Sequence, residues 1–253
     1  MTNKTNNNIM AEIDKRLRAF INTPENFLDS IALVNVFHQY PVWASDTPYA
    51  IEVDGKKVTP VFTDEKDLEA FKAIQESAQT KKWVHRSGLE ILEEALVNKL
   101  YGLVFNLKKT GDFGNTTTFK SQELVAFINY FTTILNRLMS EDNQKAEKLE
   151  KYYLIPSFSM TNKENEKKLF PTMTNPDGDI YIPVFSNLES FARWYNHEKF
   201  GLRFREAKGT VLALRLTELE QLQSKENEIE SSQGIVINPF DEEMELLSWE
   251  KFT

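Results

Sequence analysis

Cysteine is absent from the 253 residues of the chain. This absence excludes disulfide bonds, cysteine-ligated zinc and a thiolate nucleophile, and it is compatible with the cytoplasm, where we expect the protein to reside. Histidine is scarce: the three residues His38, His85 and His197 lie far apart and do not have the spacing of a histidine metal motif. The sequence therefore predicts no metal site and no cofactor.

Long hydrophobic runs and an excess of positive charge are also lacking. No stretch approaches the roughly 20 apolar residues of a membrane-spanning helix, and no apolar signal-peptide region follows the polar segment Met1–Asn8. The 30 Lys and Arg residues are outnumbered by 38 Asp and Glu residues, which gives a formal charge of −8. Because phosphate binding relies on clustered Lys and Arg, we expect neither nucleic acid nor a membrane as a partner.

Signatures of catalysis are missing as well. Asp112-Phe113-Gly114 spells a kinase magnesium motif, but the glycine-rich loop and the catalytic-loop signature of a kinase are absent. Asp177-Gly178-Asp179 lacks the twelfth-position glutamate of a calcium loop, so we interpret it as a turn. The acidic run Asp241–Glu245 indicates a solvated edge. We predict no catalytic residues, and an enzyme is the less favoured hypothesis.

Two short strings occur twice in the same order. Thr59–Thr63 (TPVFT) returns as Ile182–Ser186 (IPVFS), and Gly102–Asn106 (GLVFN) returns as Gly234–Asn238 (GIVIN). The offset is 123 for the first string (183 minus 60) and 132 for the second (234 minus 102). Surface loops tolerate insertions, so this drift is compatible with duplication of one domain. Two weaker matches extend the repeat: Tyr40-Pro41-Val42 with Ile155-Pro156-Ser157, and Ser121-x-Glu123 with Ser248-x-Glu250.

Hydrophobic periodicity predicts strands and helices in each half. We expect a disordered tail over 1–8, helices over 9–21, 24–36 and 88–99, one or two helices over 121–151, further helices directly after Thr63, Ser186 and Thr217, and a polar loop over 161–168. The expected strands cover 40–44, 49–53, 57–62, 83–85, 102–107, 116–119, 152–158, 169–173, 180–185, 210–216, 233–238 and 244–247.

Local signals refine these predictions. The pair Asp54-Gly55 predicts a hairpin. The apolar runs Leu103–Phe105 and Val211–Leu214 are typical of central strands that are buried on both faces. Hydroxyl side chains before four helices predict N-caps, and Glu189 would complete a capping box after Ser186. The expected caps are Thr23, Thr63, Ser186 and Thr217.

Together the elements predict a mixed α/β (α+β) fold with two tandem copies, each a mixed β-sheet covered by helices and joined to the other by a long helical connector. We expect an N-terminal tail and helix over 1–23, a first domain over 24–130, the connector over 131–151 and a second domain over 152–253.

The repeated strings resemble a known family. The string Pro60–Thr63, the helix that carries Leu68 and Phe71, and the later strand Gly102–Asn106 are similar to the SseB N-terminal domain, whose family is named for enhanced serine sensitivity and occurs widely in bacteria. The chain resembles a tandem pair of such domains. The resemblance implies a cytoplasmic bacterial protein of mixed α/β fold, and it implies no catalytic residues.

Four polar positions are candidates for ligand contact. Thr63 and Ser186 precede helices, whose first N–H groups can bind an anion, although capping alone also explains them. Asn106 and Asn238 begin the loops after the repeated strands. We hypothesise a non-catalytic module that binds an unidentified protein or small molecule, with the groove between the copies as the contact surface. The alternatives are an enzyme or a binder of an amino-acid-related molecule, and a toxin-neutralising immunity protein.

Overall fold

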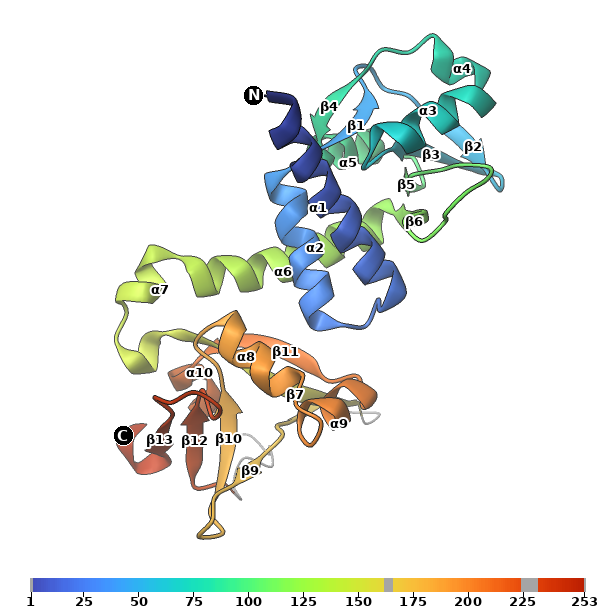
Figure 1. Ribbon diagram of the computed structural model, residues 1–253. Coiled ribbons are helices and arrows are strands. Elements are labelled where there is room, and N and C mark those ends of the chain that lie inside the picture. The colour runs from blue at the N-terminus through green and yellow to red at the C-terminus, as the bar shows by residue number, and fades with distance from the viewer. Residues whose placement is uncertain (1, 162–165, 224–231, 253) are drawn as a thin grey trace. The chain divides into compact units, whose positions relative to one another are not determined.

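Helices and strands alternate along the chain in the computed structural model (Figure 1), which describes residues 2–161, 166–223 and 232–252. The chain divides into two units, Met1–Thr132 (unit 1) and Thr133–Thr253 (unit 2). Helix α6 (Ser121–Met139) runs across the border between them. The mixed α+β class predicted from the sequence is confirmed.

Unit 1 begins with two helices and continues with strands and helices in alternation. Its elements are α1 (Thr2–Asn22), α2 (Phe27–Gln39), β1 (Pro41–Ser45), β2 (Ile51–Val53), β3 (Lys56–Val61), α3 (Glu65–Ile74), α4 (Glu76–Gln79), β4 (Trp83–Ser87), α5 (Gly88–Val97), β5 (Gly102–Phe105), β6 (Thr117–Lys120) and the first part of α6.

Unit 2 repeats this alternation after the end of α6. Its elements are α7 (Glu141–Lys145), η1 (Lys148–Glu150), β7 (Tyr152–Thr161), β8 (Glu166–Leu169), β9 (Met173–Thr174), β10 (Ile180–Val184), α8 (Leu188–Tyr195), α9 (Gly201–Glu206), β11 (Thr210–Arg215), α10 (Leu216–Gln223), β12 (Gly234–Ile237), β13 (Glu245–Ser248) and η3 (Trp249–Phe252).

Within the described residues each unit contains two sheets where we expected one. In unit 1 the larger sheet has the order β2-β3-β5-β6, with β3 and β5 parallel, and β1 pairs with β4 in a separate antiparallel sheet. A bridge between Trp43 and Phe62 links the two sheets, and each of these residues donates its N–H to the carbonyl oxygen of the other at 2.9 Å. In unit 2 the sheets are β9-β10-β12-β13 and β11-β7-β8, and the bridge joins Leu154 to Phe185.

The two strings of the sequence repeat form the parallel strand pair of each unit. Val58 lies opposite Gly102 in unit 1, and Tyr181 lies opposite Gly234 in unit 2, so the strings meet in the same register. The glycines are required by their surroundings. A Cβ atom on Gly102 would lie 1.8 Å from the carbonyl oxygen of the neighbouring antiparallel strand, and one on Gly234 would lie 2.0 Å from the equivalent oxygen.

The two weaker sequence matches are wrong in register. The bridges join Trp43 to Phe62 and Leu154 to Phe185, and the two phenylalanines are equivalent in the repeat. Trp43 therefore corresponds to Leu154, an offset of 111 (154 minus 43) instead of 115. Gly102 lies opposite Lys120 and Gly234 opposite Ser248, so Ser248 corresponds to Lys120 and not to the serine that follows it. Short proline and serine matches carry too little information to fix a register.

The helix caps also differ from the prediction. Asp64 caps α3 by accepting a hydrogen bond from the backbone N–H of Asp67 at 2.7 Å, and Asn187 caps α8 through the backbone N–H of Ser190 at 2.8 Å. Glu189 pairs with an arginine one turn later and completes no capping box. The residues that we predicted as caps do not cap these helices. Thr23, Thr63 and Ser186 lie before the observed caps, which are Asn26, Asp64 and Asn187 in the same order. Thr217 lies within α10.

Three further predictions were wrong. Helix α1 begins at Thr2, where we expected a tail. Strand β8 occupies the end of the expected polar loop, of which residues 162–165 lie outside the described residues. Strand β11 is the edge of its sheet, and only Val211 and Ala213 are buried along it. The other run, Leu103–Phe105, is central and buried as predicted.

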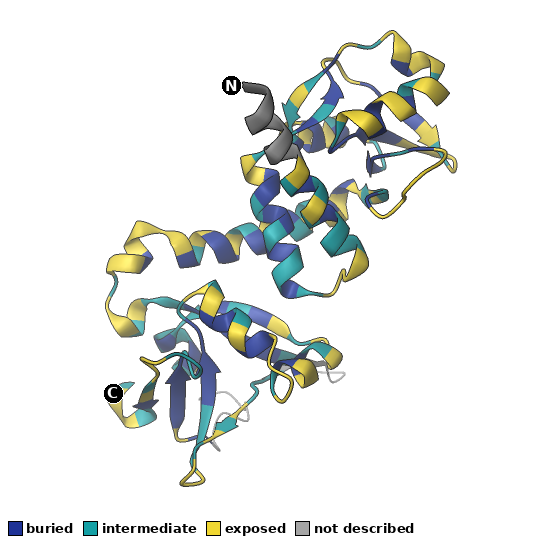
Figure 2. Cartoon of the chain, in the orientation of Figure 1, coloured by how far each residue is buried: buried dark blue, intermediate teal, exposed yellow. Residues whose placement is uncertain are grey.

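The strands of the parallel pairs carry the core of each unit. Figure 2 shows that β12 is buried along its length, with exposed residues on the outer faces of the helices. In unit 1, Phe62 and Phe71 pack on Trp83 with ring centroids 5.6 and 6.0 Å apart. The turn Asp54-Gly55 joins β2 to β3 with φ angles of 50° and 73°, as the hairpin signal predicts.

Candidate functional site

The four candidate polar residues meet in two equivalent pairs at the carboxyl ends of the parallel strands. In unit 1, Asn106 Oδ1 accepts a hydrogen bond from Thr63 N at 2.8 Å, and Asn106 Nδ2 donates to Thr63 Oγ1 at 2.9 Å. In unit 2, Asn238 Oδ1 accepts from Ser186 N at 2.9 Å, and Asn238 Nδ2 donates to Ser186 Oγ at 2.8 Å. The structure therefore brings the four residues together as one pair in each unit.

The pair geometry depends on the backbone of the asparagines. Asn106 and Asn238 both have φ of 49°, in the left-handed region that asparagine tolerates better than most residues. Their backbone N–H groups donate to Val61 and Val184 at 2.9 Å, so each side chain turns back towards the end of the neighbouring strand. Each asparagine thus ties two parallel strands together where they end.

In unit 1 the pair belongs to a larger buried network. Asn115 donates through Nδ2 to Asp67 Oδ2 at 2.9 Å and accepts through Oδ1 from Lys108 Nζ at 2.8 Å. Lys108 also forms an ion pair with Asp67 at 2.6 Å, and their side chains are only 4% and 10% exposed. Loss of one partner of such a pair is costly, because it leaves a buried charge without compensation.

Helix α1 joins this network through Asp14. Its Oδ1 accepts from Thr63 Oγ1 at 2.8 Å and from Asn115 Nδ2 at 2.6 Å, and its Oδ2 accepts from Arg18 Nε at 2.6 Å. Burial raises the pKa of Asp14, but the hydrogen bonds from Arg18, Asn115 and Thr63 outweigh it and hold the pKa below its ordinary value. Burial also raises the pKa of the cap Asp64, and there the hydrogen bond from Asp67 does not outweigh it, so the pKa of Asp64 lies above its ordinary value.

Unit 2 has a simpler polar arrangement beside its pair. Asp241 Oδ2 accepts from Ser190 Oγ at 2.5 Å, and Asp241 Oδ1 accepts from Arg193 Nη1 at 2.5 Å. The first acid of the predicted acidic edge is therefore paired within the fold. Glu242 and Glu243 are exposed, as predicted, and Glu245 forms an ion pair with Lys148.

Each of the three histidines contacts a different partner, so they do not form a shared site. His38 contacts Thr132 Oγ1 at 2.7 Å, and His85 packs on Trp43 with ring centroids 3.9 Å apart. His197 stacks on Phe240 with ring planes 7° apart. Within the described part of the chain, no group of three acidic or histidine side chains is placed to hold a metal ion.

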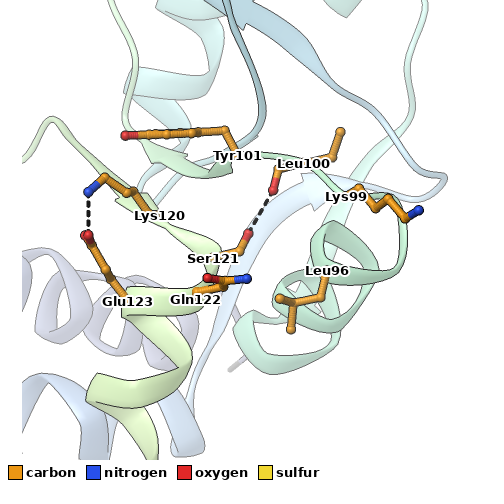
Figure 3. A pocket seen from close by; sticks show the side chains of 8 residues that line it. All are labelled: Leu96, Lys99, Leu100, Tyr101, Lys120, Ser121, Gln122 and Glu123. Atoms are coloured by element: carbon orange, nitrogen blue, oxygen red, sulfur yellow. Dashed lines mark hydrogen bonds and ion pairs between the residues drawn. The ribbon is translucent and has the colours of Figure 1, made fainter.

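A pocket of about 390 Å³ opens in unit 1 between the end of α5 and the start of α6 (Figure 3). Two segments line it: Leu96 and Lys99–Tyr101 come from one, and Lys120–Glu123 from the other. A hydrogen bond from the backbone N–H of Ser121 to the carbonyl oxygen of Tyr101 at 2.8 Å holds the segments together. Figure 3 shows the ring of Tyr101 and the side chain of Leu96 on different sides of this joint.

Lysines surround the aromatic side of the pocket. Lys56 Nζ lies 4.3 Å from the centre of the Tyr101 ring and donates to its hydroxyl at 3.2 Å, which fixes the ring by a cation–π contact and a hydrogen bond. Lys120 forms an ion pair with Glu123, and the resulting hydrogen bond raises the pKa of Lys120. Lys99, at φ 55°, is exposed at the rim.

Sequence reasoning missed both the buried network and the pocket. Asp67 and Lys108 lie 41 residues apart and Asp14 and Asn115 lie 101 apart, so no local pattern joins them. The available signal was the tripeptide Asn106-Leu107-Lys108, in which a lysine lies two positions after the repeated asparagine.

The fold and the two polar pairs define a mixed α+β protein in which an asparagine closes each parallel strand pair. Residues 138–248 match the family model of the SseB protein N-terminal domain, so the recognition of this family is confirmed for a stretch that covers most of unit 2. The assignment of a second such domain to unit 1, and hence the tandem pair, stays a prediction. Among curated proteins, none matches the chain.

Two solved structures are similar to the chain. One is Anabaena Tic22 (protein transport), which is 11% identical, with 88% of this chain and 92% of that chain covered and a TM-score of 0.23. The other is Tic22 from Plasmodium falciparum, which is 13% identical, with 80% and 90% covered and a TM-score of 0.21. At these TM-scores the likenesses carry no argument about this protein. Among its described helices, none is both long and apolar enough to cross a membrane.

Proposed function

We propose that the chain is a non-catalytic protein-interaction module of the bacterial cytoplasm, and that the pocket at Tyr101 receives an acidic segment of its partner. The charge around this pocket carries the proposal. The lining carries Lys99, Lys120 and one acid, Glu123, which gives a local charge of +1 (two minus one) in a chain of charge −8, and Lys56 lies over the Tyr101 ring beside it. Such a reversal of sign favours a negatively charged partner and speeds its association.

The apolar surface beside the lysines supports a protein partner over a small anion. Leu96 is 39% exposed and Val97 is 75% exposed at the end of α5, and the ring of Tyr101 forms the opposite wall. Exposed tyrosine and aliphatic side chains within a charged rim are typical of interaction sites. We therefore expect a partner segment that carries both a carboxylate and an aliphatic side chain.

The state of the buried polar groups favours binding over catalysis. The side chains of Asn106, Asn115 and Lys108 form hydrogen bonds with one another, with Thr63 and with two aspartates inside the fold. Groups that are held in this way position the backbone and offer no nucleophile or base to a substrate. The cysteine-free composition and the resemblance to a bacterial family support the cytoplasmic location, which fractionation of the host cell would test.

Charge reversal at the pocket tests the proposal. The tagged chain is captured from lysate of its host, a co-purifying protein is identified by native mass spectrometry, and its affinity is then measured with the purified proteins. The double variant K99E/K120E should bind at least about tenfold more weakly, because like charges then face each other. The matched control is K208E, since Lys208 is also an exposed lysine with positive φ after a helix.

The outcomes separate the hypotheses. If K99E/K120E binds the partner as tightly as the unchanged chain does, the pocket is not part of the interface. A retained small molecule in place of a protein would support the ligand-binding alternative. A chain recovered without any partner would overturn the interaction module. Thermal unfolding of K99E/K120E must match that of K208E, so that a lost interaction reports binding and not misfolding.

A further inference from the structure

The hydrogen bond that joins the two walls of the Tyr101 pocket occurs in both units. In unit 1 the backbone N–H of Ser121 donates to the carbonyl oxygen of Tyr101 at 2.8 Å. In unit 2 the backbone N–H of Trp249 donates to the carbonyl oxygen of Gln233 at 3.2 Å. Each of these oxygens belongs to the residue directly before the repeated glycine. Ser121 and Trp249 therefore occupy equivalent positions, and one side chain is small where the other is large.

The two side chains make the same hydrogen bond from this position. Ser121 Oγ donates to the carbonyl oxygen of Leu100 at 3.3 Å (Figure 3). In unit 2, Trp249 Nε1 donates to the equivalent oxygen, that of Ser232, at 3.0 Å. The ring of Trp249 also packs on the core of unit 2 and on Phe252, with ring centroids 5.2 Å apart. Unit 2 thus places its own indole ring at this position, whereas unit 1 has a serine and a pocket there.

The size and the charge of the pocket in unit 1 indicate what enters it. Its volume of about 390 Å³ lies at the small end of ligand pockets, which range over roughly 300–1,000 Å³, so it suits a single ring. Lys56 of unit 1 stands where unit 2 has Asp179. Lys120 stands where unit 2 has Ser248. The open pocket and the lysines therefore occur together, which favours a ring that is accompanied by a negative charge.

We infer that the pocket at Tyr101 receives a tryptophan from the acidic segment of the partner, and that its indole N–H donates to the carbonyl oxygen of Leu100 as Trp249 donates to its own acceptor in unit 2. A carbonyl oxygen has two lone pairs, so the long bond from Ser121 leaves one for the indole. The inference rests on the proposed function and names the residue that enters the pocket. The aliphatic side chain of the partner then lies outside the pocket, against the exposed Val97.

The probe is indole-3-acetate, which combines an indole ring with a carboxylate. Its binding to the full chain is followed by NMR of the methyl groups of Leu96 and Leu100, which line the pocket, and we expect the ring current to shift their signals. The N-methyl derivative lacks the N–H and should bind about fivefold more weakly, the usual effect of one hydrogen bond between neutral groups. Cyclohexylacetate, which has the charge without the aromatic ring, should bind more weakly still. K99E/K120E should weaken the binding of indole-3-acetate and leave that of neutral indole unchanged.

Three variants test the equivalence of the two positions. S121W supplies the ring from the chain itself, as unit 2 does, and should abolish binding of the probe. S159W is the matched control, because it adds a tryptophan at an exposed serine of unit 2 and should have no effect. W249S makes the reverse change and should open a second site, so neutral indole should raise its midpoint of thermal unfolding. This last measurement does not depend on the folding of S121W.

The outcomes separate this inference from the proposed function. Equal binding of indole-3-acetate and cyclohexylacetate, no methyl shift at millimolar probe, or no effect of indole on W249S would each overturn the inference. A protein partner whose binding is weakened by K99E/K120E but not by folded S121W would keep the proposed function and overturn the inference. Probe binding that S121W abolishes, in a chain that captures no protein, would support the ring site and overturn the proposed function.

Discussion

Replacement of Asn106 by alanine should destabilise unit 1 by about 4 kcal/mol. The side chain makes three hydrogen bonds, to Thr63 N, Thr63 Oγ1 and the carbonyl oxygen of Asn115, and the residue is 0% exposed. The substitution leaves the Thr63 N–H and the Asn115 oxygen buried without partners, at roughly 1–3 kcal/mol each. Alanine at φ 49° adds about 1 kcal/mol of backbone strain.

Two companion variants separate these causes. N106G should be about 1 kcal/mol more stable than N106A, because glycine adopts a positive φ without strain. N238A should cost only about 2 kcal/mol, since its two hydrogen bonds go to one half-buried residue, Ser186.

Guanidinium unfolding at equilibrium measures all three variants. Tryptophan fluorescence reports each unit separately, through Trp83 in unit 1 and Trp194 in unit 2, once the other tryptophans are replaced by phenylalanine. Two units can unfold in separate transitions, so the fits must allow for both. A cost for N106A below about 1 kcal/mol, or equal to that of N238A, would refute the reasoning from buried hydrogen bonds.

Two further predictions concern substitution of the strand glycines and the stability of the fold at acid pH. G102A and G234A should each destabilise their unit by about 2 kcal/mol or more, since the new Cβ would lie 1.8 or 2.0 Å from a carbonyl oxygen. G178A meets no atom within 4 Å and should cost only the backbone strain of alanine at φ 92°, about 1 kcal/mol. Thermal unfolding measures these costs, and equal shifts would contradict the steric reasoning. Burial raises the pKa of Asp14, but hydrogen bonds from Arg18 and two neutral donors favour the ionised form more strongly. The pKa is therefore lower in the folded chain than the unfolded value of 3.8. The stability that ionised Asp14 contributes to the fold is therefore fully present above that pH and is lost as the pH falls through the lower folded pKa. D14N should flatten the acid side of a curve of stability against pH, and an unchanged curve would contradict the assignment.

The sequence predicted the four strands of the two parallel pairs well because two independent strings had to agree, although it did not predict that the strands of each pair run parallel. Pro60 and Pro183 fall at equivalent positions of the repeat, and the structure pairs them with Val104 and Val236, which are also equivalent. The strings carry glycines that no other residue can replace, so their pattern contains real steric information.

The caps and the site residues were harder to predict, because they depend both on adjacent residues and on residues far away in the sequence. Thr63 and Asp64 are adjacent and both are good cap residues. Asp64 is the cap, and the Thr63 hydroxyl is instead engaged by Asn106 and Asp14. That asparagine lies 43 residues further along the chain. Similarly, the ion pair between Asp67 and Lys108 depends on packing that no periodicity reveals.

The combined demands on the asparagine that follows β5 and on the one that follows β12 have an evolutionary consequence. Asn106 must adopt a positive φ, accept from a backbone N–H and donate to a hydroxyl and a carbonyl oxygen at once. Glycine satisfies only the first demand, and aspartate cannot donate. We expect lineages that keep this strand pair to retain asparagine there even where the strands themselves drift, as Leu103 has its counterpart in Ile235 and Phe105 in Ile237.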